Sequence, residues 1–326
     1  MNRKPVASLS LDLDNQWSYM KTHGNPDWKT LPSYLDVVVP RFLEMVDRLG
    51  YNMTVFIVGQ DAALPQHHEV LRSITRAGHE VGNHSFHHEP WLHLYSEEQI
   101  EAELASTEDA LEAATGARPI GFRGPGYSLS ETVLRVLKRR GYYYDASTLP
   151  TFIGPLARAY YFMSAKLTPE ERAQRMKLFG TLKDGLRPLK TYTWRVDEER
   201  LLEIPVTTLP LFRVPMHVSY VLYLAMYSRA AAMSYFRSAL LACRMAGIEP
   251  SLLLHPLDFM GRGEVPCLDF FPAMKMPAAD KLSIVEQCLS LLGRRFQVVS
   301  MRDHARHALA SAHPRERALE VPGLAG

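Results

Sequence analysis

The sequence of 326 residues has few cysteines, almost no net charge and no long apolar run. Cys243, Cys267 and Cys288 are widely spaced and odd in number, which excludes a disulfide framework or a thiolate metal cage. The net charge of +2 gives no reason to expect a nucleic-acid partner. A membrane span needs roughly 18 apolar residues, and the nearest run, 220–227, is far shorter.

The amino-terminal segment, MNRKPVASLSLDLD, is basic but lacks the features of a signal peptide. A signal peptide needs an apolar core of roughly 7–15 residues and a small-residue cleavage site. Here the apolar stretch meets Asp12 almost at once. Together with the unpaired cysteines, this predicts a cytoplasmic protein.

What the sequence does contain is a regular alternation of short apolar runs and amphipathic segments. Hydrophobic residues make up 47% and charged residues 22%, which excludes a disordered, collagen-like or coiled-coil chain. Strands are predicted at about 6–13, 53–58, 80–83, 120–123, 142–145, 201–205, 250–255 and 296–300. Helices are predicted at about 37–49, 67–77, 100–114, 130–140, 228–246 and 277–292. Because no hairpin signal such as Asn-Gly is present, we expect an α/β fold with a parallel sheet, either a closed or nearly closed barrel or a doubly wound open sheet.

One long basic segment interrupts this alternation. Between Pro150 and Arg195 the chain has nine Lys/Arg and only three acidic residues. A connection of this length usually carries function. We therefore expect one domain, 1–312, whose insertion at about 146–200 forms a lid or collar, with a solvated helical excursion as the alternative. Residues 313–326 are expected to form a disordered tail.

Chemically active residues follow several predicted strands, where parallel α/β folds place their active sites. Asp12 and Asp14 share one face of a strand, so that one can bind a metal while the other acts as a base. His84 and His88 are four residues apart and would project from one side of a helical turn, where they can hold one cation. His87 competes with His88 as the second ligand.

Two further motifs supply a cation and an imidazole. Arg123 ends a predicted strand inside FRGPGY, where a Gly/Pro turn allows close approach of the backbone to a ligand. His255 ends the apolar strand LLLHP, a suitable place for a catalytic imidazole. One Asp with two His leaves open positions on a catalytic cation. With no Cys near, Zn²⁺, Co²⁺, Ni²⁺ and Mn²⁺ all fit.

In this order the motifs resemble those of the NodB-type polysaccharide deacetylases, carbohydrate esterase family 4. SLDLD resembles the D-x-D form of the first motif in the peptidoglycan-deacetylase-like and deformylase-like branches. HSFHH matches the H-[ST]-x-x-H motif, and FRGPGYS, YYDAS, LEIPVT and LLLHP resemble the segments that follow. The resemblance extends from Ser8 to about Ser300. It implies a distorted (β/α)7-type barrel, so that one of the eight expected strands would lie outside it.

The resemblance also implies a metal site and a pair of catalytic residues. Asp14, His84 and His88 would bind a divalent ion, with zinc as the first candidate. Asp12 would be the general base and His255 the general acid.

Four other positions receive supporting roles from the resemblance. Arg123 would hold the general base in place. Asp145 would be a supporting residue in contact with Arg123 or His255. Tyr127 and Pro125 would contact the substrate, with the Tyr127 N–H in an oxyanion hole.

These roles predict a metal-dependent hydrolase that removes an acetyl group from an N-acylated amino sugar. The basic insertion, with Tyr160, Tyr161 and Phe162, and the apolar stretch 220–227 favour a lipid-linked or phosphate-bearing glycoconjugate and peripheral contact with the inner membrane face. A deformylase or a non-sugar amidohydrolase is the alternative enzyme. A catalytically silent carbohydrate-binding barrel is the alternative of another class. The oligomeric state is not predicted.

Overall fold

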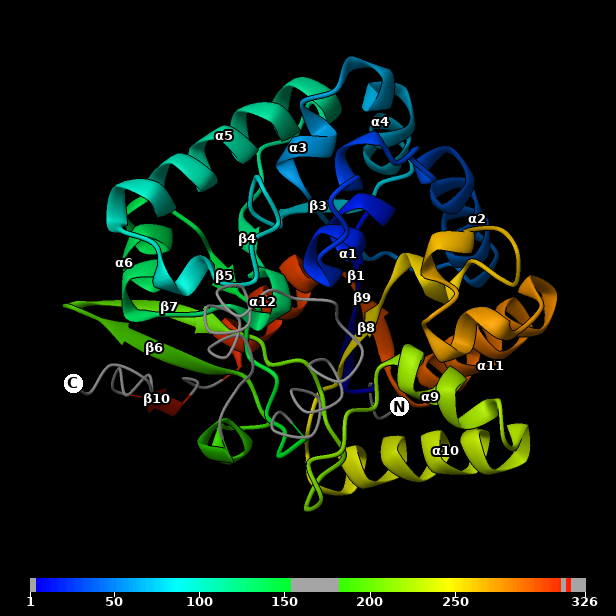
Figure 1. Cartoon of the computed structure of the whole chain (residues 1–326). Helices are drawn as coiled ribbons and strands as arrows, with labels where there is room; N and C mark the ends of the chain where they lie inside the picture. The colour runs from blue at the N-terminus through cyan, green and yellow to red at the C-terminus, as the bar shows by residue number, and fades with distance from the viewer. Residues whose placement is uncertain (1–3, 154–181, 312–314, 318–326) are drawn as a thin grey trace.

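A computed structural model describes residues 4–153, 182–311 and 315–317, and one mixed sheet runs through it (Figure 1). The strand order is β10-β6-β7-β5-β4-β3-β2-β1-β8, and β9 also pairs with β1. The strands are β1 (Val6–Leu13), β2 (Thr54–Ile57), β3 (Glu80–Asn83), β4 (Gly121–Phe122), β5 (Tyr144–Asp145), β6 (Tyr192–Val196), β7 (Glu199–Glu203), β8 (Ser251–Leu254), β9 (Gln297–Val299) and β10 (Arg315–Arg317). Every pair of strands is parallel except β6 with β7.

Helices separate most of these strands, as the alternating pattern predicts. They are α1 (Gln16–His23), α2 (Leu35–Leu49), α3 (Gly59–Ala62), α4 (His68–Arg76), α5 (Glu97–Thr115), α6 (Glu131–Arg139), α9 (Val218–Ala225), α10 (Arg229–Met245), α11 (Ala278–Arg295) and α12 (Met301–Ala310). Local sequence explains several of their ends. Ser96 and Gln99 form a capping box at the start of α5, and Gly50 ends α2 in the left-handed conformation. None of the described helices is both long and apolar enough to cross a bilayer.

The expected α/β fold of the distorted barrel type is confirmed. The expectation that all its strands are parallel is wrong for one pair, β6 and β7, which is antiparallel. Among the described residues the pairing path is open, because β8 and β10 stand at its two ends. β6 and β7 form an antiparallel hairpin in which Tyr192 pairs with Glu203. Its turn contains Asp197 with φ of +53° rather than an Asn-Gly pair. The sequence analysis missed β6 because this turn carries no glycine.

The core is centred on β1, which is buried at all eight of its positions. Val38, Phe42 and Met45 of α2 and Ile284 and Val285 of α11 pack into the same apolar cluster. In Figure 1, α5 and α6 lie at the opposite end of the sheet from α10 and α11. Burying each large apolar side chain stabilises the fold by about 1.5–3 kcal/mol, so this packing fixes the strand that carries both aspartates.

Strand register brings distant segments to one edge of the sheet. Leu13 pairs with Ile57, Ile57 with Asn83, and Asn83 with Phe122. Because these strands are parallel, the residues that follow their ends lie side by side at the carboxyl edge. The register therefore brings Asp14, His84 and Arg123 to one level.

The expected insertion and tail are described only in part. Residues 154–181, which include the Tyr160–Phe162 aromatics, lie outside the described residues, so the lid or collar stays a prediction. The described remainder forms a short 3-10 helix (Leu182–Leu186) and the β6–β7 hairpin. Of the expected tail, Arg315–Arg317 form β10 and pair in parallel with β6.

Candidate metal and catalytic site

Three side chains converge at the carboxyl edge of the sheet. One ligand atom from each of Asp14, His84 and His88 lies within 4.8 Å of the others, and all three residues are buried. Asp14 Oδ1 is 2.9 Å from His88 Nε2 and 3.3 Å from His84 Nε2. Two imidazole nitrogens and one carboxylate oxygen are thus turned toward one point.

The position of each histidine has a local cause. His84 directly follows β3, and its Nδ1–H donates to the Arg123 carbonyl at 2.6 Å. This hydrogen bond places the proton on Nδ1 and leaves the Nε2 lone pair for a ligand. His88 is reached through a loop in which Ser85 and His88 have φ of +58° and +52°. The expected helical turn is therefore wrong, because these residues are in non-helical conformations.

The choice between the two neighbouring histidines is made by a glutamate on α5. His87 Nδ1 lies 2.5 Å from Glu103 Oε1, and the His87 side chain is 53% exposed. The backbone N–H of His87 donates to the other carboxylate oxygen of Glu103. His87 thus pairs with Glu103, and His88 is the one that faces Asp14.

The electrostatics of the three side chains fit a divalent cation. Burial raises the pKa of Asp14, but His88 and His84 more than offset it and bring the pKa below its ordinary value. Asp14 is therefore an anion with two imidazole nitrogens facing it. A carboxylate with two histidines is a ligand set of divalent first-row metals, and it leaves open positions for water and substrate.

Asp12 is held by a fully buried arginine. Arg123 Nη1 is 2.8 Å from Asp12 Oδ1, and the same nitrogen donates to Ser10 Oγ at 2.9 Å. Arg123 Nε donates to the Ala146 carbonyl at 3.0 Å, and the guanidinium lies 4.5 Å from the centre of the Phe56 ring. These contacts fix the side chain of Asp12, which lies in the last pleat of β1, two residues before Asp14.

His255 follows β8, the strand on the other side of β1. Leu11 pairs with Leu254, so Asp12 and His255 occupy the next level of the sheet. Ser219 Oγ is 3.2 Å from His255 Nδ1, and the His255 backbone N–H donates to Asp258 Oδ2 at 2.9 Å. Neither Ser219 nor Asp258 was identified from the sequence, although Asp258 follows the LLLHP motif by only two residues.

His217, another residue that the sequence analysis missed, packs beside this imidazole. Its ring centre is 5.8 Å from that of His255 and 4.5 Å from that of Tyr220. Burial, followed by the charges of His255 and Arg123, lowers the pKa of His217 well below its ordinary value. His217 stands at the start of α9 and does not follow a predicted strand. The search for polar residues after strand ends therefore did not find it.

Asp145 has different partners from those expected. Ser147 Oγ donates to Asp145 Oδ1 at 2.6 Å and accepts the Gly124 N–H at 2.8 Å. Glu203 lies beside Asp145 on β7, and burial raises the pKa of Asp145. Among the described residues no ion pair or hydrogen bond joins Asp145 to Arg123 or to the expected acid. Asp145 thus supports the turn after β4 through Ser147.

The turn after β4, which begins at Pro125, places Tyr127 near Asp12 but changes one expected role. Gly126 and Tyr127 have φ of +56° and +63°, and the Tyr127 N–H donates to the Gly124 carbonyl at 2.9 Å. That N–H already has an acceptor, so the expected oxyanion contact is not available in this conformation. Burial and the nearby Asp12 raise the pKa of Tyr127, which keeps its phenol neutral.

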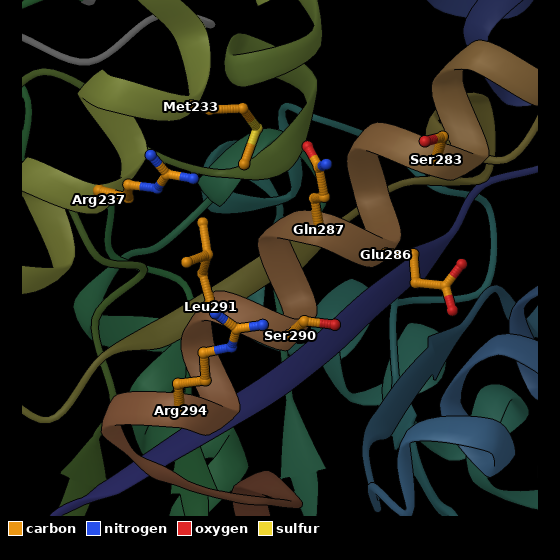
Figure 2. Close-up of a pocket in the computed structure, with 8 residues that line it drawn as sticks. All are labelled: Met233, Arg237, Ser283, Glu286, Gln287, Ser290, Leu291 and Arg294. Atoms are coloured by element: carbon orange, nitrogen blue, oxygen red, sulfur yellow. The ribbon is translucent and has the colours of Figure 1, made fainter. Parts of the chain in front are cut away.

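A separate groove of about 330 Å³ lies between α10 and α11 (Figure 2). Met233 and Arg237 from α10 face Gln287, Ser290 and Arg294 from α11 across it. None of the predicted metal or catalytic residues lines this groove. A substitution in it therefore leaves every predicted metal and catalytic residue in place.

Comparisons with known proteins agree with the fold and with the family resemblance. A crystal structure of a protein from Mycobacterium smegmatis, provisionally assigned as a polysaccharide deacetylase, aligns over 99% of this chain and 100% of that chain, with a TM-score of 0.62 and 20% identity. This likeness supports the fold. Residues 30–144 match the family model described as polysaccharide deacetylase. This match agrees with the resemblance stated from the motifs over that segment of the chain.

Two curated relatives are similar over part of their length. A peptidoglycan deacetylase-like protein from Gibberella zeae is 32% identical over 170 residues, which cover 50% of this chain and 48% of the relative. The peptidoglycan deacetylase of Helicobacter pylori is 25% identical over 153 residues, which cover 46% of this chain and 51% of the relative. The chain thus spans about half the length of the curated relatives that it matches.

Proposed function

We propose that the protein is a metal-dependent N-deacetylase of N-acetylated amino sugars. The observation that carries this proposal is the convergence of Asp14, His84 and His88 beside Asp12, which Arg123 holds in place. The match to the polysaccharide deacetylase family model and the similarity to the peptidoglycan deacetylase of Helicobacter pylori support the substrate class.

The proposed mechanism assigns one task to each residue. A divalent ion, zinc as the first candidate, would make water more acidic and polarise the amide carbonyl when bound by Asp14, His84 and His88. Asp12 takes a proton from the attacking water, and its contact with Arg123 fixes its position. His255, in its protonated form, gives a proton to the departing amine. Water and the amide thereby become acetate and a free amino sugar.

The finer substrate proposal concerns an apolar or phosphate-bearing part of the substrate. α9 follows His217 and carries Tyr220 and Tyr223, which are 38% and 46% exposed, and Tyr227, just beyond the helix, is 75% exposed. Aromatic side chains of this kind suit the apolar portion of a lipid-linked sugar at a membrane surface. This supports a lipid-linked glycoconjugate and peripheral contact with a membrane, whereas a phosphate-bearing substrate is favoured by the basic residues between Pro150 and Arg195.

The test is an assay of the zinc-loaded protein on N-acetylated and N-formylated sugars, free, phosphate-bearing and lipid-linked. We expect free amine and an equal amount of acetate from the N-acetyl sugars. We expect Asp12→Asn to abolish turnover while metal stays bound, and Ser290→Ala, in the distant groove, to leave turnover unchanged. Formate release alone would favour a deformylase, and no release from any substrate by metal-loaded protein would refute the proposal.

A second experiment tests the membrane part of the proposal. We expect the protein to sediment with anionic vesicles and to turn over the lipid-linked substrate faster than its soluble analogue. Absence of vesicle binding, with equal rates on both substrates, would refute membrane contact without affecting the assignment as a deacetylase.

A further inference from the structure

We propose that Ser219 and Asp258 form a hydrogen-bonded relay that positions His255 and fixes which ring nitrogen carries its transferable proton. This inference rests on the proposed function for the acid role of His255, but the hydrogen-bond geometry stands independently of it. Ser219 and Asp258 act as positioning residues, because they work through the imidazole.

The direction of the relay follows from the number of protons available. Ser219 Oγ is 2.8 Å from Asp258 Oδ1, and when Asp258 is ionised its carboxylate can only accept, so the serine hydroxyl donates there. A serine hydroxyl has a single proton to donate. Toward His255 Nδ1, 3.2 Å away, the same oxygen must therefore accept, and Nδ1 must carry a hydrogen. In neutral His255 the lone pair is then on Nε2, and in the protonated ring the proton to be transferred is on Nε2.

Asp258 is fixed by its own backbone and by burial. It closes the short 3-10 helix Pro256–Asp258, and its Oδ2 accepts the His255 backbone N–H at 2.9 Å. Its own N–H donates to the His255 carbonyl at 2.9 Å, and only 1% of its surface is exposed. One carboxylate oxygen thus holds the main chain of His255 and the other holds Ser219, so the ring and the backbone are oriented by the same group.

The groups around His255 and Asp258 include both signs of charge. Burial raises the pKa of Asp258, whereas the charge of His255 and the hydrogen bonds from the His255 backbone and Ser219 oppose that rise. His217, from the segment before α9, is buried and favours its neutral form. Lys281 of α11 is buried behind Asp258 and donates from Nζ to the Leu257 carbonyl at 2.5 Å. Asp12 lies at the level of His255 on β1, but Arg123 pairs with it.

The relay also joins two segments that are distant in the sequence. Ser219 lies in the first turn of α9, whereas His255 and Asp258 follow β8. α9 packs on α10 and carries the exposed tyrosines at its other positions. The placement of the imidazole therefore depends on how α9 sits against the sheet, and a change of α9 would reach the acid through Ser219.

The test compares Ser219→Ala, Ser219→Thr, Asp258→Asn and the control Ser290→Ala. Nitrogen-15 NMR of histidine-labelled protein reports the tautomer and the pKa of His255, whose signal is assigned by its loss in His255→Gln. We expect the Nδ1–H tautomer in the wild type, in Ser219→Thr and in Ser290→Ala. We expect a mixture of tautomers in Ser219→Ala, because the link to the carboxylate is lost.

The kinetic arm uses zinc-loaded protein and the N-acetyl sugar that it turns over. We expect Ser219→Ala and Asp258→Asn to lower kcat about 10–100-fold with little change in KM, and to shift the alkaline limb of the kcat–pH profile to lower pH. Ser219→Thr should restore both, because it keeps the hydroxyl. A purely structural role would not shift the pH profile and would not be rescued selectively by threonine.

The outcomes separate this inference from the proposed function. An unchanged His255 tautomer and pH profile in folded Ser219→Ala would overturn the relay, even in an active deacetylase. If no N-acyl substrate is turned over but Ser219→Ala still changes the tautomer, the proposed function is refuted and the relay is supported. Circular dichroism confirms that each variant is folded before it is scored.

Discussion

The buried pair of Arg123 and Asp12 makes the most quantitative prediction. Replacing Arg123 by leucine would remove a guanidinium that is 0% exposed and leave Asp12, 5% exposed, without its cation at 2.8 Å. Removing one member of a buried ion pair typically costs about 3–5 kcal/mol, because the remaining charge stays out of water. The Ala146 carbonyl would lose a donor as well, so we expect the upper part of that range for Arg123→Leu.

A double-mutant cycle isolates the contribution of the pair. Asp12→Asn removes the charge that Arg123→Leu leaves uncompensated, so the double variant should be less destabilised than the sum of the single variants. We expect a coupling of about 2 kcal/mol or more, within the range seen for contacting groups. The assay is urea unfolding of chelator-treated protein followed by circular dichroism, so that metal binding does not contribute.

An exposed ion pair provides the matched control. Arg48 lies 2.8 Å from Glu44 on α2, with side chains 48% and 72% exposed. Arg48→Leu should change the free energy of unfolding by less than about 1 kcal/mol, because water screens this pair. If the effects of Arg123→Leu and Asp12→Asn add to within about 0.5 kcal/mol, the pair does not stabilise this region and the reasoning fails.

Three further predictions follow from particular contacts. We expect His88→Ala to lose stoichiometric zinc and His87→Ala to retain it, measured by plasma mass spectrometry of dialysed protein; equal zinc in both would contradict the ligand assignment. Burial lowers the pKa of Lys281 from 10.5 to about 8, so the unfolded chain binds more protons between these pH values and the free energy of unfolding rises with pH across that window. Lys281→Met should remove this rise in urea titrations at about pH 8 and about pH 10, and a rise that persists would rule out Lys281 as its source. Gly82→Ala should destabilise the fold by about 1–3 kcal/mol in the same assay, because its Cβ would come within 2.5 Å of the Phe56 ring that underlies Arg123; an unchanged midpoint would show that the ring can move aside.

The candidate site shows where sequence reasoning works and where it needs the fold. Predicted strand ends pointed to the segments that carry Asp14, His84 and His88, and the family resemblance assigned these three residues to the metal. The register places those ends together. The geometry expected for the two histidines was nevertheless wrong. His88 reaches Asp14 through positive φ angles at Ser85 and at His88 itself, a loop conformation that the spacing of the residues does not encode.

Residues that act from outside the strand ends escaped prediction. His217 and Ser219 belong to the start of α9, and only the packing of that helix against the sheet brings them to His255. Asp145, in contrast, was predicted from the sequence but has other partners than expected. The family resemblance implied that it contacts Arg123 or His255, yet its side chain accepts from Ser147, and Glu203 lies beside it on β7.

The sequence by itself determined the alternation of strands and helices, and with it the carboxyl edge where the functional residues gather. Apolar periodicity and capping residues are local, so these features can be read without knowing the fold. The tertiary structure alone decided that β6 and β7 form a hairpin, that Glu103 turns His87 away, and that Ser219 and Asp258 hold His255. Each of these depends on side-chain direction and on contacts between distant segments, which hydrophobic patterning does not encode.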